Sequence, residues 1–154
     1  LVSHPGIDKV AFTGSTGAGR KVAEVCGRLL RPVSLELGGK SAAIILDDVN
    51  IEHLLPGLHF ASFGNNGQIC ALSSRILAPA SRYDEIVDAI AGLAKGLKVG
   101  SSLEKDTQIG PLASSEHRAR VESYIAVGKV EAGLVAGEGR TKHVGRGWHV
   151  APPV

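Results

Sequence analysis

The sequence predicts an α/β fold in which short parallel strands alternate with helices, and three observations support this. Short apolar runs typical of buried strands are separated by segments whose apolar residues recur with helical spacing. Glycine makes up 20 of the 154 residues, well above the usual share of about 7%, with no collagen-like repeat. Apolar residues account for 44% and the net charge is only +2, so a packed core is expected rather than disorder.

The expected elements follow one another in a regular order along the chain. Ser15 or Thr16 can cap the first helix, and Pro32 ends it. Asp47, Asp48 and Asn50 offer caps for the second helix. By residue number we expect strand 9–13, a helix that follows the Ser15 or Thr16 cap and has its apolar face at 22–30, strand 33–37, strand 42–46, helix 50–63, strand 75–79, helix 83–97, a helix around 121–125 and one strand around 134–136 within a loop-rich segment 133–147.

Composition excludes several classes of protein. Lys and Arg (17) are interspersed with Asp and Glu (15), so no basic patch indicates nucleic-acid binding. No apolar run approaches the ~18 residues of a membrane span. The two cysteines make no disulfide framework, which favours a reducing, cytoplasmic location. The spacing of the histidines along the sequence is not that of metal ligands, so we expect no bound metal ion.

The chain contains no methionine and opens with Leu1 and Val2. No charged segment followed by an apolar one stands at this end, so removal of a signal peptide has no visible support. We therefore expect both ends to be cuts within a longer protein.

The glycine-rich turn from Gly14 to Gly19 invites a phosphate-binding interpretation. A P-loop would need Lys and a hydroxyl after the second glycine, but Arg20 and Lys21 follow Gly19. The dinucleotide fingerprint also fails, because Val22 stands where its third glycine should be. Two interpretations stay open: an anion site at a helix N-terminus, or an ordinary capped turn.

Two reactive side chains stand in unusual contexts. Cys70 follows a polar, turn-forming segment, whereas Cys26 lies on an apolar helix face as structural cysteines usually do. Cys70 is either structural or a nucleophile, and a nucleophilic thiol needs electropositive surroundings. Glu36 interrupts an apolar strand beside Gly38 and Gly39; it either faces solvent or lines a cleft as a general base.

Five segments stand in order along the chain, with Cys70 lying 34 positions after Glu36: Phe12-Thr-Gly-Ser-Thr16 with Gly19, Leu35-Glu-Leu-Gly-Gly-Lys-Ser41, Phe63-x-x-x-Gly67-Gln-Ile-Cys70, Asp106-Thr-Gln-Ile-Gly-Pro-Leu112, and Gly147-Trp-His-Val-Ala-Pro-Pro-Val154. Taken together and in this order, they resemble the signature set of the NAD(P)-dependent aldehyde dehydrogenase superfamily. The resemblance implies an aldehyde dehydrogenase-like fold with Rossmann-type parallel sheets.

The resemblance also implies a role for each matching residue. Cys70 would attack an aldehyde to give a thiohemiacetal, which becomes a thioester after hydride transfer to NAD or NADP. Glu36 would activate the water that hydrolyses the thioester, and its presence favours release of a free acid over transfer to coenzyme A. The cofactor contacts would come from Thr13, Gly14, Ser15, Ala18 and Leu37.

The resemblance further implies that the chain is a central fragment covering parts of two domains. Residues 1–38 would end a cofactor-binding domain, and residues 39–154 would open a catalytic domain. The full-length enzyme would form a homodimer or homotetramer, and we expect the fragment to be inactive by itself. The competing hypothesis is a non-catalytic remnant or a truncated, partner-binding product of such a gene.

Overall fold

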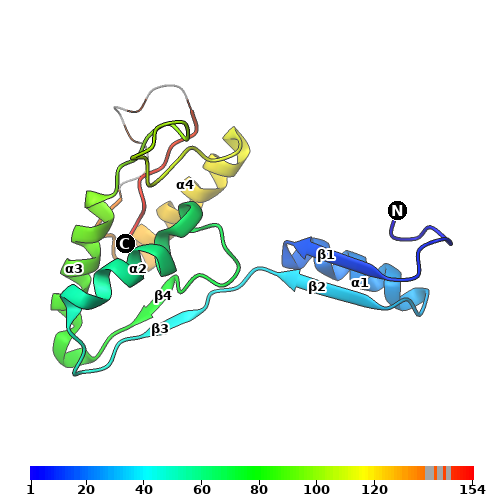
Figure 1. The fold of residues 1–154 in the computed structure, drawn as a ribbon, viewed down its shortest axis with the longest axis horizontal. Helices are drawn as coiled ribbons and strands as arrows, with labels where there is room; N and C mark the ends of the chain where they lie inside the picture. The colour runs from blue at the N-terminus through cyan, green and yellow to red at the C-terminus, as the bar shows by residue number, and fades with distance from the viewer. Residues whose placement is uncertain (138–140, 142–143, 145–146) are drawn as a thin grey trace. The chain divides into compact units, whose positions relative to one another are not determined.

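In the computed structural model the chain divides into two compact units (Figure 1). The structure describes residues 1–137, 141, 144 and 147–154. The smaller unit consists of Leu1–Lys40 with Ile69–Ala71, and the larger unit consists of Ser41–Gln68 with Leu72–Val154. The domain boundary expected between residues 38 and 39 stays a prediction.

The smaller unit is a strand–helix–strand unit made of β1 (Val10–Gly14), α1 (Thr16–Arg28) and β2 (Val33–Leu37). The two strands pair in parallel, with Val10 opposite Val33 and Gly14 opposite Leu37. Parallel neighbours need a crossover connection, which α1 supplies. The parallel pairing is therefore confirmed, and β1 is shifted by one residue from the expected 9–13.

The sheet of this unit has two unlike faces. Val10, Phe12 and Leu35 are half-buried, while the residues that alternate with them, including Thr13 and Glu36, are exposed. Alternate residues of a strand point to opposite faces, so α1 covers the first set. Cys26 of α1 is completely buried.

The larger unit repeats this architecture with β3 (Ala42–Ile44), α2 (Ile51–Gly67) and β4 (Arg75–Leu77). The strands again pair in parallel, from Ala42 opposite Arg75 to Ile44 opposite Leu77. Both are shorter than the expected 42–46 and 75–79. Pro79 has no N–H group to continue β4, and the chain bends there into a short 3₁₀ helix, η1 (Ala80–Arg82), so the pairing with β3 ends at Ile44 and Leu77. The helices α3 (Tyr83–Gly96) and α4 (Ser115–Glu131) follow.

The core of the larger unit lies where α2 and α3 pack together over the sheet. Ile45, Leu58, Ile86 and Ile90 form one buried cluster, and Ala91, Ala94 and Ala136 form a second one. The buried positions of α3 follow the helical spacing that predicted it. Helix α4 has no buried residue, and Tyr124 on it is 73% exposed.

The prediction of a strand around Leu134–Ala136 is wrong. The N–H groups of Val135 and Ala136 both donate to the Val154 carbonyl, at 2.8 and 3.2 Å, and Val154 donates back to Ala136 at 3.1 Å. The pairing cannot continue, since Pro152 and Pro153 have no N–H groups to donate. Part of the loop-rich segment 133–147 lies outside the described residues.

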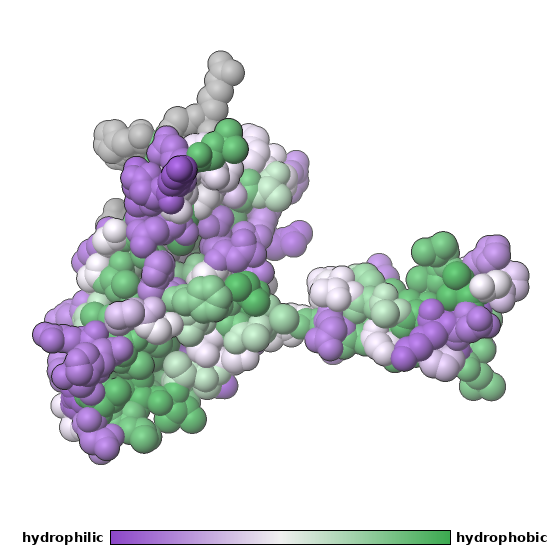
Figure 2. Space-filling view, viewed as in Figure 1, coloured by the Kyte–Doolittle hydropathy of each residue, from purple (hydrophilic) through white to green (hydrophobic). Residues whose placement is uncertain are grey.

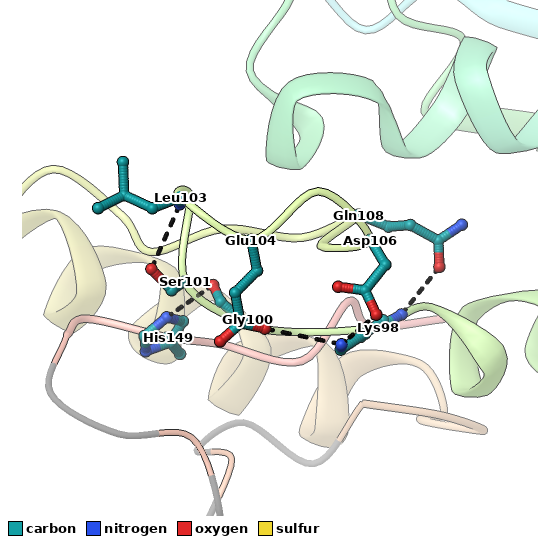
Figure 3. A network of polar contacts seen from close by, with 8 residues as sticks. All are labelled: Lys98, Gly100, Ser101, Leu103, Glu104, Asp106, Gln108 and His149. Carbon is teal, nitrogen blue, oxygen red and sulfur yellow. Dashed lines mark hydrogen bonds and ion pairs between the residues drawn. The ribbon is translucent and has the colours of Figure 1, made fainter.

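A loop from Lys98 to Gly110, the 98–110 loop, is held together by its own polar groups (Figure 3). Lys98 forms ion pairs with Asp106 and Glu104, and its backbone N–H donates to the Gln108 side chain at 2.9 Å. The buried ring of His149 makes a 3.1 Å hydrogen bond to the Gly100 carbonyl.

Apolar side chains also remain on the surface of the larger unit, as the green areas of Figure 2 show. Ile44 is 70% exposed, Leu46 64% and Phe60 72%. Among the described helices, none is long and apolar enough to cross a membrane.

Candidate functional site

The residues predicted from the first two motifs meet at one edge of the β1–β2 sheet. Thr13 lies opposite Glu36, and Gly14 lies opposite Leu37, at the carboxyl ends of both strands. Thr13 and Glu36 are exposed, so their side chains share the sheet face that α1 does not cover. The carboxyl edge of a parallel sheet is where α/β proteins bind ligands.

The N-terminus of α1 opens at the same edge. Ser15 is its N-cap, since its Oγ accepts from the Ala18 N–H at 3.3 Å, and its carbonyl accepts from Gly19 at 2.8 Å. Helix geometry leaves the N–H groups of Thr16 and Gly17 without a partner inside the helix. The first turn contains no acidic residue, so these groups and the helix dipole together favour a bound anion.

Gly19 fixes how closely α1 approaches the end of β2. A Cβ atom built at this buried position would lie 2.6 Å from Cδ2 of Leu37, closer than any real contact. At Gly17, two residues earlier, a Cβ atom would meet nothing within 4 Å. The turn from Ser15 to Gly19 and the Glu36–Leu37 segment can therefore pack closely because position 19 has no side chain.

The segment that carries Cys70 begins with an unusual turn. Helical backbone in α2 ends at Phe63, as predicted, and Gly64 is extended. Asn65, Asn66 and Gly67 then follow with φ of +48°, +58° and +74°. The left-handed conformation costs an ordinary residue ~1–2 kcal/mol, and glycine and asparagine tolerate it best.

The structure places the two cysteines in opposite environments, as their sequence contexts suggested. Cys26 is buried, whereas Cys70 is exposed and free. Cys70 belongs to the same compact unit as Glu36. A Cβ atom at Gly39 would lie 3.4 Å from the Cys70 carbonyl oxygen, so the thiol-bearing segment packs against Gly39, two residues after the end of β2.

Sequence reasoning missed the contacts that hold the turn before Cys70. The Asn66 side chain pairs with both backbone groups of Gly110, and the Ser62 hydroxyl donates to the Ser73 carbonyl at 2.9 Å. Asn66 and Gly110 are 44 positions apart, so no local spacing signals the pair. Within the described ranges, no group of three or more His, Cys, Asp or Glu residues is arranged to hold a metal ion.

Comparison with known proteins gives the same assignment along the whole chain. The "Aldehyde dehydrogenase family" matches residues 1–154. Geranial dehydrogenase of Castellaniella defragrans is 59% identical over 154 residues, and betaine aldehyde dehydrogenase of Atriplex hortensis is 37% identical over 155 residues; both alignments cover all of this chain.

Solved structures of aldehyde dehydrogenases have a segment with the same fold as this chain. The crystal structure of a Mycobacterium tuberculosis aldehyde dehydrogenase complexed with NAD+ matches with a TM-score of 0.95 and 46% identity over 99% of this chain. The chain spans 32% of that structure, 32% of the geranial dehydrogenase and 31% of the betaine aldehyde dehydrogenase. A whole-length family match, with sequence identity and fold in agreement, means that this chain belongs to the aldehyde dehydrogenase family.

Proposed function

We propose that this chain supplies the nucleophile, the general base and part of the NAD(P) surface of a longer enzyme that oxidises an aldehyde to a carboxylic acid. The observation that carries the proposal is the single sheet edge where Thr13, Gly14, Glu36 and Leu37 meet the N-terminus of α1. The free N–H groups of Thr16 and Gly17 suit a cofactor pyrophosphate. The Ala18 N–H already donates to Ser15, so Ala18 would contact the cofactor through its methyl group.

Cys70 begins the reaction. Its thiolate sulfur adds to the carbonyl carbon of the aldehyde, a C–S bond forms, and the carbonyl oxygen becomes an oxyanion. The backbone N–H of Cys70 is the donor that this chain offers to that oxygen. When bound at this sheet edge, NAD(P) would supply the hydride acceptor for that carbon, and Cys70 would then hold the acyl group as a thioester.

Glu36 completes the reaction. Its carboxylate takes a proton from water, and the resulting hydroxide adds to the thioester carbonyl. The C–S bond then breaks, which releases the carboxylic acid and regenerates the Cys70 thiolate. Glu36 is exposed on the face that α1 leaves open, so water has access to it.

The proposed substrate is an apolar aldehyde of the geranial kind rather than a charged amino aldehyde. Support comes from 59% identity to a geranial dehydrogenase, against 37% to a betaine aldehyde dehydrogenase. The NAD+ complex of the 46% identical relative favours NAD over NADP. We further propose that the whole enzyme is a cytoplasmic homodimer or homotetramer, consistent with its free cysteines.

A chimera tests the chemistry, with these 154 residues replacing the matching third of the Castellaniella geranial dehydrogenase. The chimera should form NADH from geranial, and Cys70→Ala should abolish this. Glu36→Gln should give one burst of NADH per site and then stop, with an acyl adduct on the Cys70 peptide in the mass spectrum. Cys26→Ala is the matched control, since Cys26 is the buried thiol, and it should retain activity.

Two results would contradict the proposal. NADH formation that survives Cys70→Ala would exclude Cys70 as the nucleophile. A folded chimera that binds NAD but never turns over would favour the non-catalytic remnant instead.

A further inference from the structure

We infer that Asn66 is a positioning residue for the nucleophile: its carboxamide anchors the left-handed turn that leads into Cys70 to the backbone of Gly110. The inference rests on the proposed function, because it takes Cys70 as the reacting group. Asn66 itself touches neither substrate nor cofactor in this assignment.

The contact uses both ends of the Asn66 side chain. Nδ2 donates to the Gly110 carbonyl at 3.0 Å, and Oδ1 accepts from the Gly110 N–H at 2.9 Å. Its neighbour Asn65 has nearly the same backbone conformation but is exposed, and its Nδ2 reaches only the Gln68 carbonyl, at 3.4 Å. Two adjacent asparagines therefore share a conformation, and one of them carries the anchor.

The backbone of Gly110, to which Asn66 is hydrogen-bonded, is itself held in place by its neighbours in the chain. Ile109 is buried and forms a parallel bridge to Val99, and the buried Leu112 donates its N–H to the Trp148 carbonyl at 2.9 Å. The chain is therefore held on both sides of Gly110. The polar network of the 98–110 loop, drawn in Figure 3, holds the preceding segment as well.

The far end of the Cys70 segment is anchored in a similar way. The buried Ser62 of α2 donates to the Ser73 carbonyl, and the Ser73 N–H donates to the Ala61 carbonyl at 2.8 Å. Residues 67–72, with Cys70 among them, therefore lie between two anchors that bind backbone groups through side chains.

This arrangement matters because nucleophilic attack is sensitive to small displacements. The sulfur must reach within about 3–3.5 Å of the carbonyl carbon, and a misplacement of 1 Å costs up to about a hundredfold in rate. Release of the turn at Asn66 gives the four-residue path to Cys70 new freedom. Loss of the anchor should therefore lower kcat while leaving the NAD-binding turn at Ser15 unchanged.

The test compares Asn66→Gly with Asn65→Gly in the chimera. Glycine tolerates the left-handed backbone and lacks the side chain, and the same change at two adjacent positions of like conformation separates the anchor from the backbone effect. Asn66→Gly should lower kcat about ten- to a hundredfold, with the KM for NAD unchanged, and should change the rate at which iodoacetamide labels the Cys70 peptide. Asn65→Gly should stay within about twofold of the parent in both rates.

Two further variants cover the remaining outcomes. Gly110→Ala adds a Cβ atom with no heavy atom closer than 3.9 Å and keeps the backbone groups, so its kcat should match the parent. Asn66→Asp keeps the acceptor for the Gly110 N–H but loses the donor, so its kcat should also fall, which tests the anchor even if Asn66→Gly fails to fold.

The inference is overturned if Cys70→Ala abolishes turnover while the folded Asn66 variants have the kcat and labelling rate of Asn65→Gly. Turnover that survives Cys70→Ala refutes the proposed function itself, so the two failures are distinct.

Discussion

Single atoms decide the packing between α1 and β2. Gly17 and Gly19 lie two positions apart at the start of one helix, yet only Gly19 faces the Leu37 side chain. Both belong to one glycine-rich turn, and nothing in the sequence distinguishes them. The difference becomes visible only when β2 is in place beside the helix.

Substitution of these two glycines should have opposite effects in the chimera. Gly19→Ala forces Leu37 to move and should destabilise the fold by about 1–3 kcal/mol and weaken NAD binding. Gly17→Ala meets open space and should stabilise the helix by up to about 1 kcal/mol. Thermal midpoints and the NAD dissociation constant measure both effects. Equal effects of the two variants would contradict the close contact.

Prediction at the residue scale succeeded where the cause is local. Ser15 caps α1 through an atom three residues away, and the chemistry of that cap is readable in the sequence. The roles predicted for Cys70 and Glu36 came from motifs and stay proposals. The Asn66–Gly110 pair depends on a tertiary contact across 44 positions, so no window of sequence contains it.

At the scale of elements, hydrophobic spacing predicted α3 well, because a long amphipathic pattern has only one good way to bury its apolar face. The short strand around Leu134–Ala136 failed for a reason outside its own sequence: its partner stretch contains Pro152 and Pro153. A run of three apolar residues does not specify the segment of the chain with which it will pair.

The stability that the ion pairs of the 98–110 loop contribute should change only at strongly acidic and strongly alkaline pH. The hydrogen bond from Lys98 lowers the pKa of Asp106, and the same bond raises the pKa of Lys98. The contribution of Asp106 is full above the ordinary carboxyl pKa of about 4 and is lost as pH falls through its lower folded value. The contribution of Lys98 is full below about 10.4 and is lost as pH rises through its higher folded value.

Lys98→Met should therefore lower the thermal midpoint of the chimera slightly and by a constant amount between about pH 5 and 9. The difference from the parent should shrink at more acidic pH and in high salt, because the groups are exposed and screened. Arg28→Met, which breaks an isolated exposed pair with Glu24 on α1, is the control. A difference that grows towards low pH would contradict the assignment.

At the scale of the whole molecule, each unit is built on a sheet with two strands in the described residues. Two-stranded sheets are marginal by themselves, and their outer edges keep unpaired N–H and C=O groups. Ile44, Leu46 and Phe60 also stay largely exposed. These features, and coverage of 31–32% of its relatives, fit a chain that works as part of a longer protein.

The 154-residue chain should accordingly show no NADH formation from geranial when purified alone, and it should bind the dye ANS through its exposed apolar surface. The same residues inside the chimera should be active and bind little dye. NADH formation by the isolated chain that disappears in Cys70→Ala would refute this prediction.

The two anchors around residues 67–72 affect which positions of this segment can be substituted. Asn66 binds the carbonyl and the N–H group of Gly110, and Ser62 binds the carbonyl of Ser73, so none of these hydrogen bonds uses the side chain of Ile69 or Ala71 on either side of Cys70. Residues 67–72 are therefore held at both ends, and side chains between the two anchors can be substituted without loss of either one. If Cys70 is the nucleophile as proposed, exchange of those two side chains in the chimera should alter which aldehyde is accepted, while Cys70 stays between the same two anchors.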